Sequence, residues 1–89
     1  MIPVNVPVLG ERELENVSEC VRTGWISSAG RYIQEFEEQW AAYCGMAHGI
    51  AVSNGTTALQ AAVASLDLEP GDEIIMPTFT IISCALGFS

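Results

Sequence analysis

Apolar residues recur at positions three or four apart in residues 11–23 and again in residues 32–44. These positions are Leu14, Val17 and Val21 in the first segment, and Ile33, Phe36, Trp40 and Tyr43 or Cys44 in the second. The spacing predicts two short amphipathic helices, with the aromatic residues of the second helix in the core. Gly24 and Gly45 follow the segments, and we expect both to end a helix in the left-handed conformation. The ten residues before the first helix contain Pro3 and Pro7, which predict an extended arm.

The second half of the chain has a different pattern. Residues 48–53 (HGIAVS) form a short apolar run typical of a buried strand, and residues 73–77 (EIIMP) form another. Between them, residues 56–66 are apolar around most of a helix, so we expect a helix sandwiched between layers. A Pro-Gly turn is expected at residues 69–72. Strand, helix and strand in this order predict a right-handed βαβ unit over residues 48–77 and a parallel sheet.

A further helix is expected to begin near Thr80. Two strands at most cannot make a parallel sheet that is covered on both faces. We therefore interpret residues 1–89 as the N-terminal segment of a larger domain.

The charge balance limits the possible partners. The formal net charge is −8, from eleven acidic and three basic residues, and all three basic residues are arginines. Nucleic acids and anionic membranes need clustered positive charge, so neither is expected as a partner. The three cysteines are odd in number and lack CxxC spacing, which indicates neither disulfides nor a metal site, and favours a reduced, cytoplasmic protein. No signal peptide or membrane span is expected either.

A polar junction, Ser53 to Thr57 (SNGTT), lies between the first predicted strand and the following helix. A helix that starts there directs unpaired N–H groups and the positive end of its dipole at one point, which suits a phosphate. The same residue types are also ordinary helix caps. The junction is neither a Walker loop nor a GxGxxG fingerprint, and on local sequence alone both interpretations stand.

Three motifs in order change this balance: the IPV arm, GWISSAGRYIQEFEEQWAAYCG, and VSNGTTALQAAVASLDLEPGDEIIMPTFT. Together they resemble the DegT/DnrJ/EryC1/StrS family of pyridoxal-phosphate-dependent sugar aminotransferases over residues 2–85. The closest resemblance is to the branch that aminates 4-keto-6-deoxy nucleotide sugars. The resemblance implies an α/β fold, the type I (aspartate aminotransferase-like) fold of pyridoxal-phosphate-dependent transferases. Residues 1–89 would then supply the start of a mostly parallel sheet with helices on both faces.

The resemblance also implies site residues. Gly55, Thr56 and Thr57 match the positions that hold the phosphate of pyridoxal 5'-phosphate (PLP), with Asn54 at the edge of the site. Ile81 occupies the position of an aromatic residue that stacks on the cofactor ring, so its contact would be aliphatic. Phe79 is expected in the core.

The family's chemistry needs a lysine that forms a Schiff base and an aspartate that holds the pyridinium nitrogen protonated. The chain contains no lysine, and in the family both residues lie beyond residue 89, so no catalytic residue is assigned here. The resemblance implies ping-pong transamination in a homodimer, with a nucleotide-sugar substrate and an amino donor such as glutamate.

Two alternatives remain open on the sequence. One is a PLP-dependent sugar dehydratase of the same family, in which histidine replaces the lysine. The other is a truncated, non-catalytic product that associates through its arm and first helices.

Overall fold

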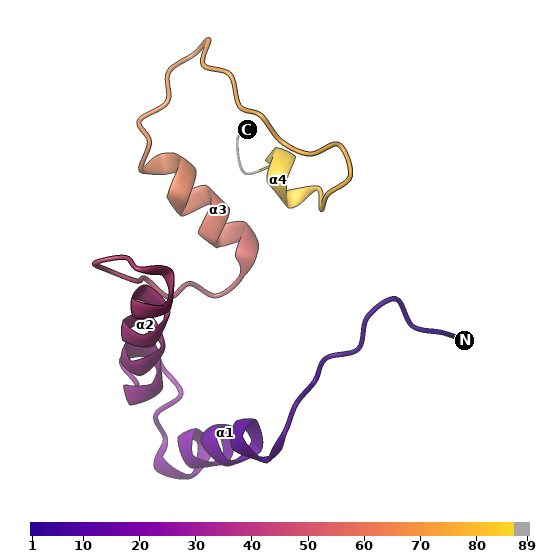
Figure 1. Ribbon diagram of the computed structural model, residues 1–89. Helices are drawn as coiled ribbons and strands as arrows, with labels where there is room; N and C mark the ends of the chain where they lie inside the picture. Colours follow the sequence, from indigo (N-terminus) through magenta and orange to yellow (C-terminus); the bar gives the residue numbers. More distant parts are fainter. Residues whose placement is uncertain (87–89) are drawn as a thin grey trace. The chain divides into compact units, whose positions relative to one another are not determined.

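The computed structural model describes residues 1–86, and this part of the chain contains four helices. They are α1 (Glu11–Thr23), α2 (Arg31–Cys44), α3 (Gly55–Ala64) and α4 (Ser83–Leu86). The chain divides into two units (Figure 1), Met1–Gly49 with α1 and α2, and Ile50–Ser89 with α3 and α4.

Helix α1 has the predicted bounds. At its start the Gly10 N–H donates a hydrogen bond to Glu13 Oε2 at 2.7 Å, and the Leu14 N–H donates to Gly10 O at 3.3 Å. Because the first N–H groups of a helix have no partner within it, the Glu13 carboxylate stabilises this end. The same hydrogen bond lowers the pKa of Glu13. Gly24 ends the helix at φ 78°, as predicted, and the arm of residues 1–10 is exposed and neither helix nor strand.

Helix α2 begins at Arg31, one residue before the predicted start. It ends at Gly45, which has φ 68° and confirms the predicted left-handed stop. The Met46 N–H donates to Ala41 O at 2.8 Å, the six-residue closure of a Schellman motif. Backbone hydrogen bonding therefore holds the start of the following loop against the end of α2.

The loop after α2 approaches the helix very closely. A Cβ atom built on Gly49 would lie 2.5 Å from the carbonyl oxygen of Glu37. Since Cβ atoms do not come this close to a backbone oxygen, only glycine allows the approach without a shift of the chain.

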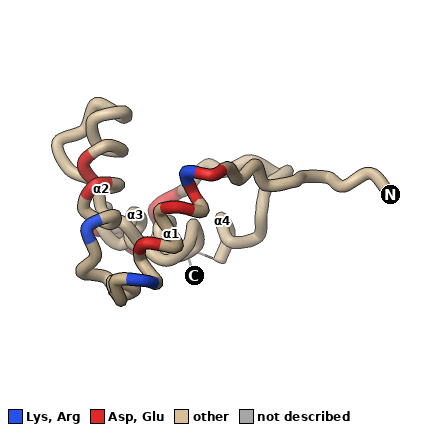
Figure 2. The backbone as a smooth tube through the Cα atoms, turned by 90° about the horizontal axis from the view of Figure 1, so that it is seen from below, with Lys and Arg blue, Asp and Glu red and all other residues tan. Residues whose placement is uncertain are grey.

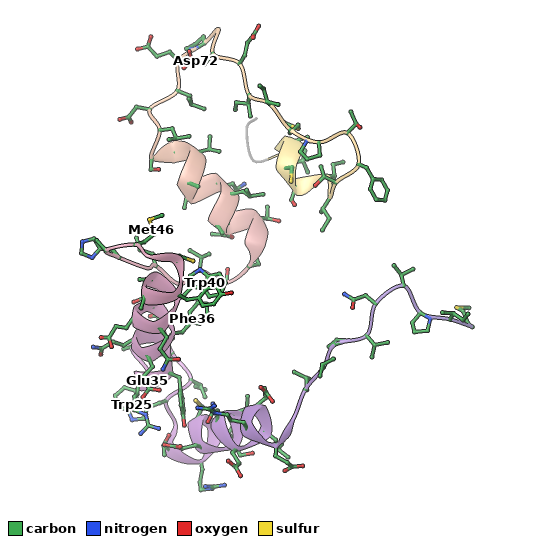
Figure 3. All side chains as sticks on the ribbon, in the orientation of Figure 1. Trp25, Glu35, Phe36, Trp40, Met46 and Asp72 are labelled. Carbon is green, nitrogen blue, oxygen red and sulfur yellow. The ribbon has the colours of Figure 1, made fainter. Side chains whose placement is uncertain are left out.

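The aromatic residues of α2 form a stripe rather than a core. The ring centroids of Phe36 and Trp40 are 6.2 Å apart, and those of Trp40 and Tyr43 are 5.6 Å apart, with both pairs stacked. Phe36 and Trp40 (Figure 3) are each 54% exposed, so the prediction that they lie in the core is wrong for this unit. Among the described residues only Ala41, at 7%, is buried.

In the second unit, α3 begins one residue before the predicted start. The N–H groups of Ser65 and Leu66 still donate to carbonyl oxygens of α3. Asp67 then takes a left-handed backbone conformation, with φ 50°. The predicted turn at residues 69–72 is confirmed, because the Asp72 N–H donates to Glu69 O at 3.0 Å. The short helix α4 follows, three residues after the predicted Thr80, and lies against α3 (Figure 1).

The predicted strands, residues 48–53 and 73–77, are not formed, and the structure assigns no strand within residues 1–86. The start of a mostly parallel sheet is therefore not confirmed. A strand obtains its ladder hydrogen bonds from a neighbour, and a parallel pair alone is only marginally stable. Ile50 and Ile75, which such a sheet would bury, are exposed.

Helix α3 is not sandwiched between layers either. One face borders a groove of about 270 Å³ along residues 50–52, lined by Ile50, Val52, Ala58, Ala61, Ala62 and Ser65. None of the residues of α3 is buried. In the described part of the chain, no helix has both the length and the apolar character needed to cross a membrane.

Candidate functional site at the start of helix α3

The polar junction of the sequence forms the start of α3, with Asn54 as the capping residue. Asn54 has an extended backbone (φ −165°, ψ 168°), and its Oδ1 accepts the Thr57 N–H at 2.9 Å. The Thr57 hydroxyl donates to the same oxygen at 3.1 Å. The amide nitrogen of Asn54 lies 3.2 Å from Ser53 Oγ and donates to it. The local sequence therefore folds as a complete N-cap.

This cap changes the set of free donors that the sequence predicts. Thr57 is one of the three residues that match phosphate-holding positions, but its N–H already donates to Asn54. Within the described residues, the N–H groups of Gly55 and Thr56 and the Thr56 hydroxyl form no hydrogen bond. Gly55 and Thr56 are exposed. Three donors thus remain for a ligand at this helix end.

Neither the packing of the described chain nor the backbone conformation requires glycine at position 55. A Cβ atom built there would meet no heavy atom of the described chain within 4 Å, and its φ is not positive. The open side of Gly55 is a place where a ligand can reach the backbone closely, which a side chain would hinder.

The charges near the start of α3 also suit an anion. No Asp or Glu occurs from Gln39 to Leu66, although the chain carries eleven acidic residues. Figure 2 shows acidic residues on α1 and α2, whereas α3 has none. The positive end of the helix dipole lies at Gly55, and no carboxylate of the neighbouring sequence opposes a phosphate there. The donor set and the charges fit the phosphate of PLP.

Ile81 lies in the same unit, just before α4. Its carbonyl oxygen accepts the Cys84 N–H at 3.1 Å, and its side chain is 74% exposed. Thr80 Oγ1 and Cys84 Sγ are 3.4 Å apart across the start of this helix. Phe79 is fully exposed, so the expectation that it lies in the core is wrong. Ile81 thus presents a largely exposed apolar side chain that a ligand can contact.

A second polar cluster, which the sequence did not predict, joins α1 to α2. The Tyr32 hydroxyl donates to Glu19 Oε2 at 2.6 Å, and Arg31 Nη2 lies 3.2 Å from Glu19 Oε1. Arg31 also pairs with Glu35 at 3.3 Å, and its guanidinium lies 4.7 Å from the centroid of the Tyr32 ring. The Arg31–Glu35 pair has i,i+4 spacing and could have been found from the sequence. The contacts to Glu19 depend on the loop geometry.

The hydrogen bonds of this cluster shift two pKa values. The bond to the Glu19 carboxylate raises the pKa of Tyr32. The bond to the Tyr32 hydroxyl and the charge of Glu19 raise the pKa of Arg31. A cavity of about 430 Å³ borders the cluster, lined also by Cys20 and Trp25. Because the charged groups already pair with one another, the cluster is best explained as a link between the helices.

Comparison with known proteins identifies relatives that match more than nine tenths of the chain. GDP-perosamine synthase of Caulobacter vibrioides is 50% identical over 84 residues, which is 94% of this chain and 23% of that protein. GDP-perosamine synthase of Vibrio cholerae is 43% identical over 83 residues, 93% of this chain and 23% of that protein. The spore coat polysaccharide biosynthesis protein SpsC of Bacillus subtilis is 37% identical over 84 residues, 94% of this chain and 21% of that protein. The chain therefore spans less than a quarter of the length of these relatives.

No solved structure matches this chain. The profile of one protein family does match, over residues 7–87. The family consists of PLP-dependent aminotransferases, which implies the PLP-dependent transferase fold. The match includes the capped start of α3 and the loop before α4. On this match, the chain belongs to the DegT/DnrJ/EryC1/StrS aminotransferase family.

Proposed function

We propose that the protein containing this chain is a PLP-dependent aminotransferase that converts a 4-keto-6-deoxy nucleotide sugar into the corresponding amino sugar. The observation that carries the proposal is the 43% to 50% identity to GDP-perosamine synthases over more than nine tenths of the chain. A GDP-linked sugar is accordingly the substrate to test first. The relative from Bacillus subtilis, named for polysaccharide biosynthesis, is consistent with a role in glycan precursor synthesis.

In this proposal the residues at the start of α3 bind the phosphate of PLP. The N–H groups of Gly55 and Thr56 and the Thr56 hydroxyl are the donors, and Asn54 holds the helix end in place. Ile81 contributes an aliphatic contact to the cofactor. Bound PLP would supply an electron sink and a carrier for the amino group between the donor and the keto sugar. The residues of this chain bind and orient the cofactor, since no lysine is present to bind it covalently.

We also propose, on the basis of the family, that the whole protein contains the parallel sheet of the type I fold. Residues 48–53 and 73–77 would then pair as parallel strands around α3 in the whole protein. We further propose a cytoplasmic homodimer, in which glutamate or a similar amino acid is the amino donor. The match to an aminotransferase family and the identity to proteins named GDP-perosamine synthase favour transamination over dehydration.

The test uses the full-length protein, loaded with PLP and incubated with a GDP-linked 4-keto-6-deoxy sugar and glutamate. We expect mass spectrometry to show the keto oxygen replaced by an amino group, with 2-oxoglutarate formed in equal amount. A product that has lost a hydroxyl group and kept its keto group, with ammonia released as glutamate is oxidised to 2-oxoglutarate, would contradict the aminotransferase and indicate the dehydratase.

A further inference from the structure

We propose that Asn54 and Thr57 are positioning residues that select the donors for the PLP phosphate without contacting it, and that Asn54 must be uncharged to do so. This inference rests on the proposed function, because it concerns the same site. It assigns different roles to two adjacent threonines: Thr56 binds the phosphate, and Thr57 holds Asn54.

The hydrogen bonds of the cap carry the first step. Asn54 Oδ1 accepts both the N–H and the hydroxyl of Thr57, at 2.9 and 3.1 Å, while the Asn54 amide nitrogen donates to Ser53 at 3.2 Å. These three bonds fix the orientation of the Asn54 side chain. A hydroxyl has one proton to donate, and Thr57 gives it to Asn54, so it has none for a phosphate. Thr57 is also half-buried, whereas Thr56 is exposed.

The charge of the cap carries the second step. Aspartate caps a helix as well as asparagine does, and the helix dipole favours its negative charge. Replacing Asn54 by Asp should therefore not lower the stability of the helix. A carboxylate there would, however, be the first acidic group between Gln39 and Leu66, next to the donors that receive a doubly charged phosphate. The neutral amide keeps the cap and avoids this repulsion.

The decisive variant is Asn54→Asp in the full-length protein, freed of cofactor. We expect its apo form to melt at or above the wild-type temperature, because the cap is kept. Its affinity for PLP should fall on the order of tenfold or more, from repulsion between like charges. Pyridoxal, which lacks the phosphate, is the matched ligand and should bind both proteins equally. Ser65→Ala, at the other end of α3, is the control variant and should bind PLP as the wild type does.

A second set of variants tests whether Thr57 acts through Asn54. Thr57→Val removes the hydroxyl bond and should weaken PLP binding roughly two- to tenfold, whereas Thr57→Ser should restore it. In an Asn54→Ala background, Thr57→Val should have no further effect, because its partner is already lost.

Each outcome bears on one claim. Wild-type PLP affinity in Asn54→Asp overturns the inference, as does an equal loss of PLP and pyridoxal binding, which would make Asn54 a structural cap only. Additive effects of the Asn54 and Thr57 variants also overturn it. If the wild-type protein binds no PLP at all, the proposed function itself is wrong, and the inference falls with it.

Discussion

A capping side chain at the start of a helix determines which N–H groups remain for a ligand. The sequence places a cap in residues 53–57, but Ser53, Asn54 and Thr56 are all capping residue types. Only the backbone shows that Asn54 is the cap and that it pairs with Thr57. The location of the helix cap could thus be predicted from the sequence, whereas the pairing of Asn54 with Thr57 could not.

Thr56→Val tests the donor that the cap leaves free. The substitution keeps the shape of the side chain but removes one hydroxyl donor to a doubly charged phosphate. Hydrogen bonds to charged groups contribute roughly 1.5–3 kcal/mol, so PLP affinity should fall about ten- to a hundredfold. Titration of the full-length apoprotein, followed by the visible absorbance of bound PLP, measures this. Gly55→Val, which blocks access to the backbone, should weaken binding as well, and unchanged affinity in both variants would leave the junction a plain helix cap.

Two glycines differ sharply in what a side chain would meet. Gly49→Ala places a Cβ atom 2.5 Å from the Glu37 carbonyl oxygen, so the loop must move away from α2. We expect a loss of about 1–3 kcal/mol of unfolding free energy, typical of overpacking. Gly55→Ala meets no atom within 4 Å and is the matched control, with unchanged or slightly raised stability. Urea unfolding of the two full-length variants compares them, and equal stability would argue against the close approach of Gly49.

At the scale of the elements, the helices follow the sequence closely and the strands do not. The helix starts and ends are set locally, by apolar spacing and by Gly24 and Gly45, so each start and end of α1 and α2 agrees within one residue. A strand needs a partner elsewhere in the chain, and residues 48–53 are not assigned as a strand in the described part of the chain. The contact of Glu19 with Tyr32 was likewise not predicted, because it depends on the geometry of the loop between α1 and α2.

The link between α1 and α2 predicts a dependence on alkaline pH. The raised pKa of Tyr32 results first from its hydrogen bond to the Glu19 carboxylate at 2.6 Å. The protonated hydroxyl therefore favours the folded state, and this contribution is complete below the pKa of unfolded tyrosine, about 10. It is lost as the pH rises through the higher pKa of the folded state.

Glu19→Gln should move the pKa of Tyr32 down toward its ordinary value, because the neutral amide is a weaker acceptor than the carboxylate. Titration of the tyrosine ring carbons by NMR, with the Tyr32 signal assigned from Tyr32→Phe, measures the shift. Glu15→Gln, on the same helix but with no hydrogen bond to Tyr32 in the described residues, serves as control. A Tyr32 pKa that is unaffected by Glu19→Gln would contradict the link.

At the scale of the whole molecule, hydrophobic content and burial disagree. Hydrophobic residues make up 49% of the sequence, which predicts a core and layers, yet Ala41 alone is buried among the described residues. Local patterns specify which face of α1, α2 or α3 is apolar, but not which surface covers it. The amphipathic faces were therefore predictable, and their packing was not.

Residues 1–89 prepared alone should neither melt cooperatively nor remain a clean monomer. Ordering a residue costs about 1–2 kcal/mol of conformational entropy, and burial of one alanine offsets almost none of it. The exposed apolar faces favour self-association, while the net charge of −8 opposes it. Salt separates the two effects, since screening shortens from about 10 Å at 0.1 M to about 3 Å at 1 M. Size exclusion should therefore show larger species as salt rises, and calorimetry no sharp transition. A single monomeric peak at all salt concentrations, with a cooperative melt, would show that this segment folds independently.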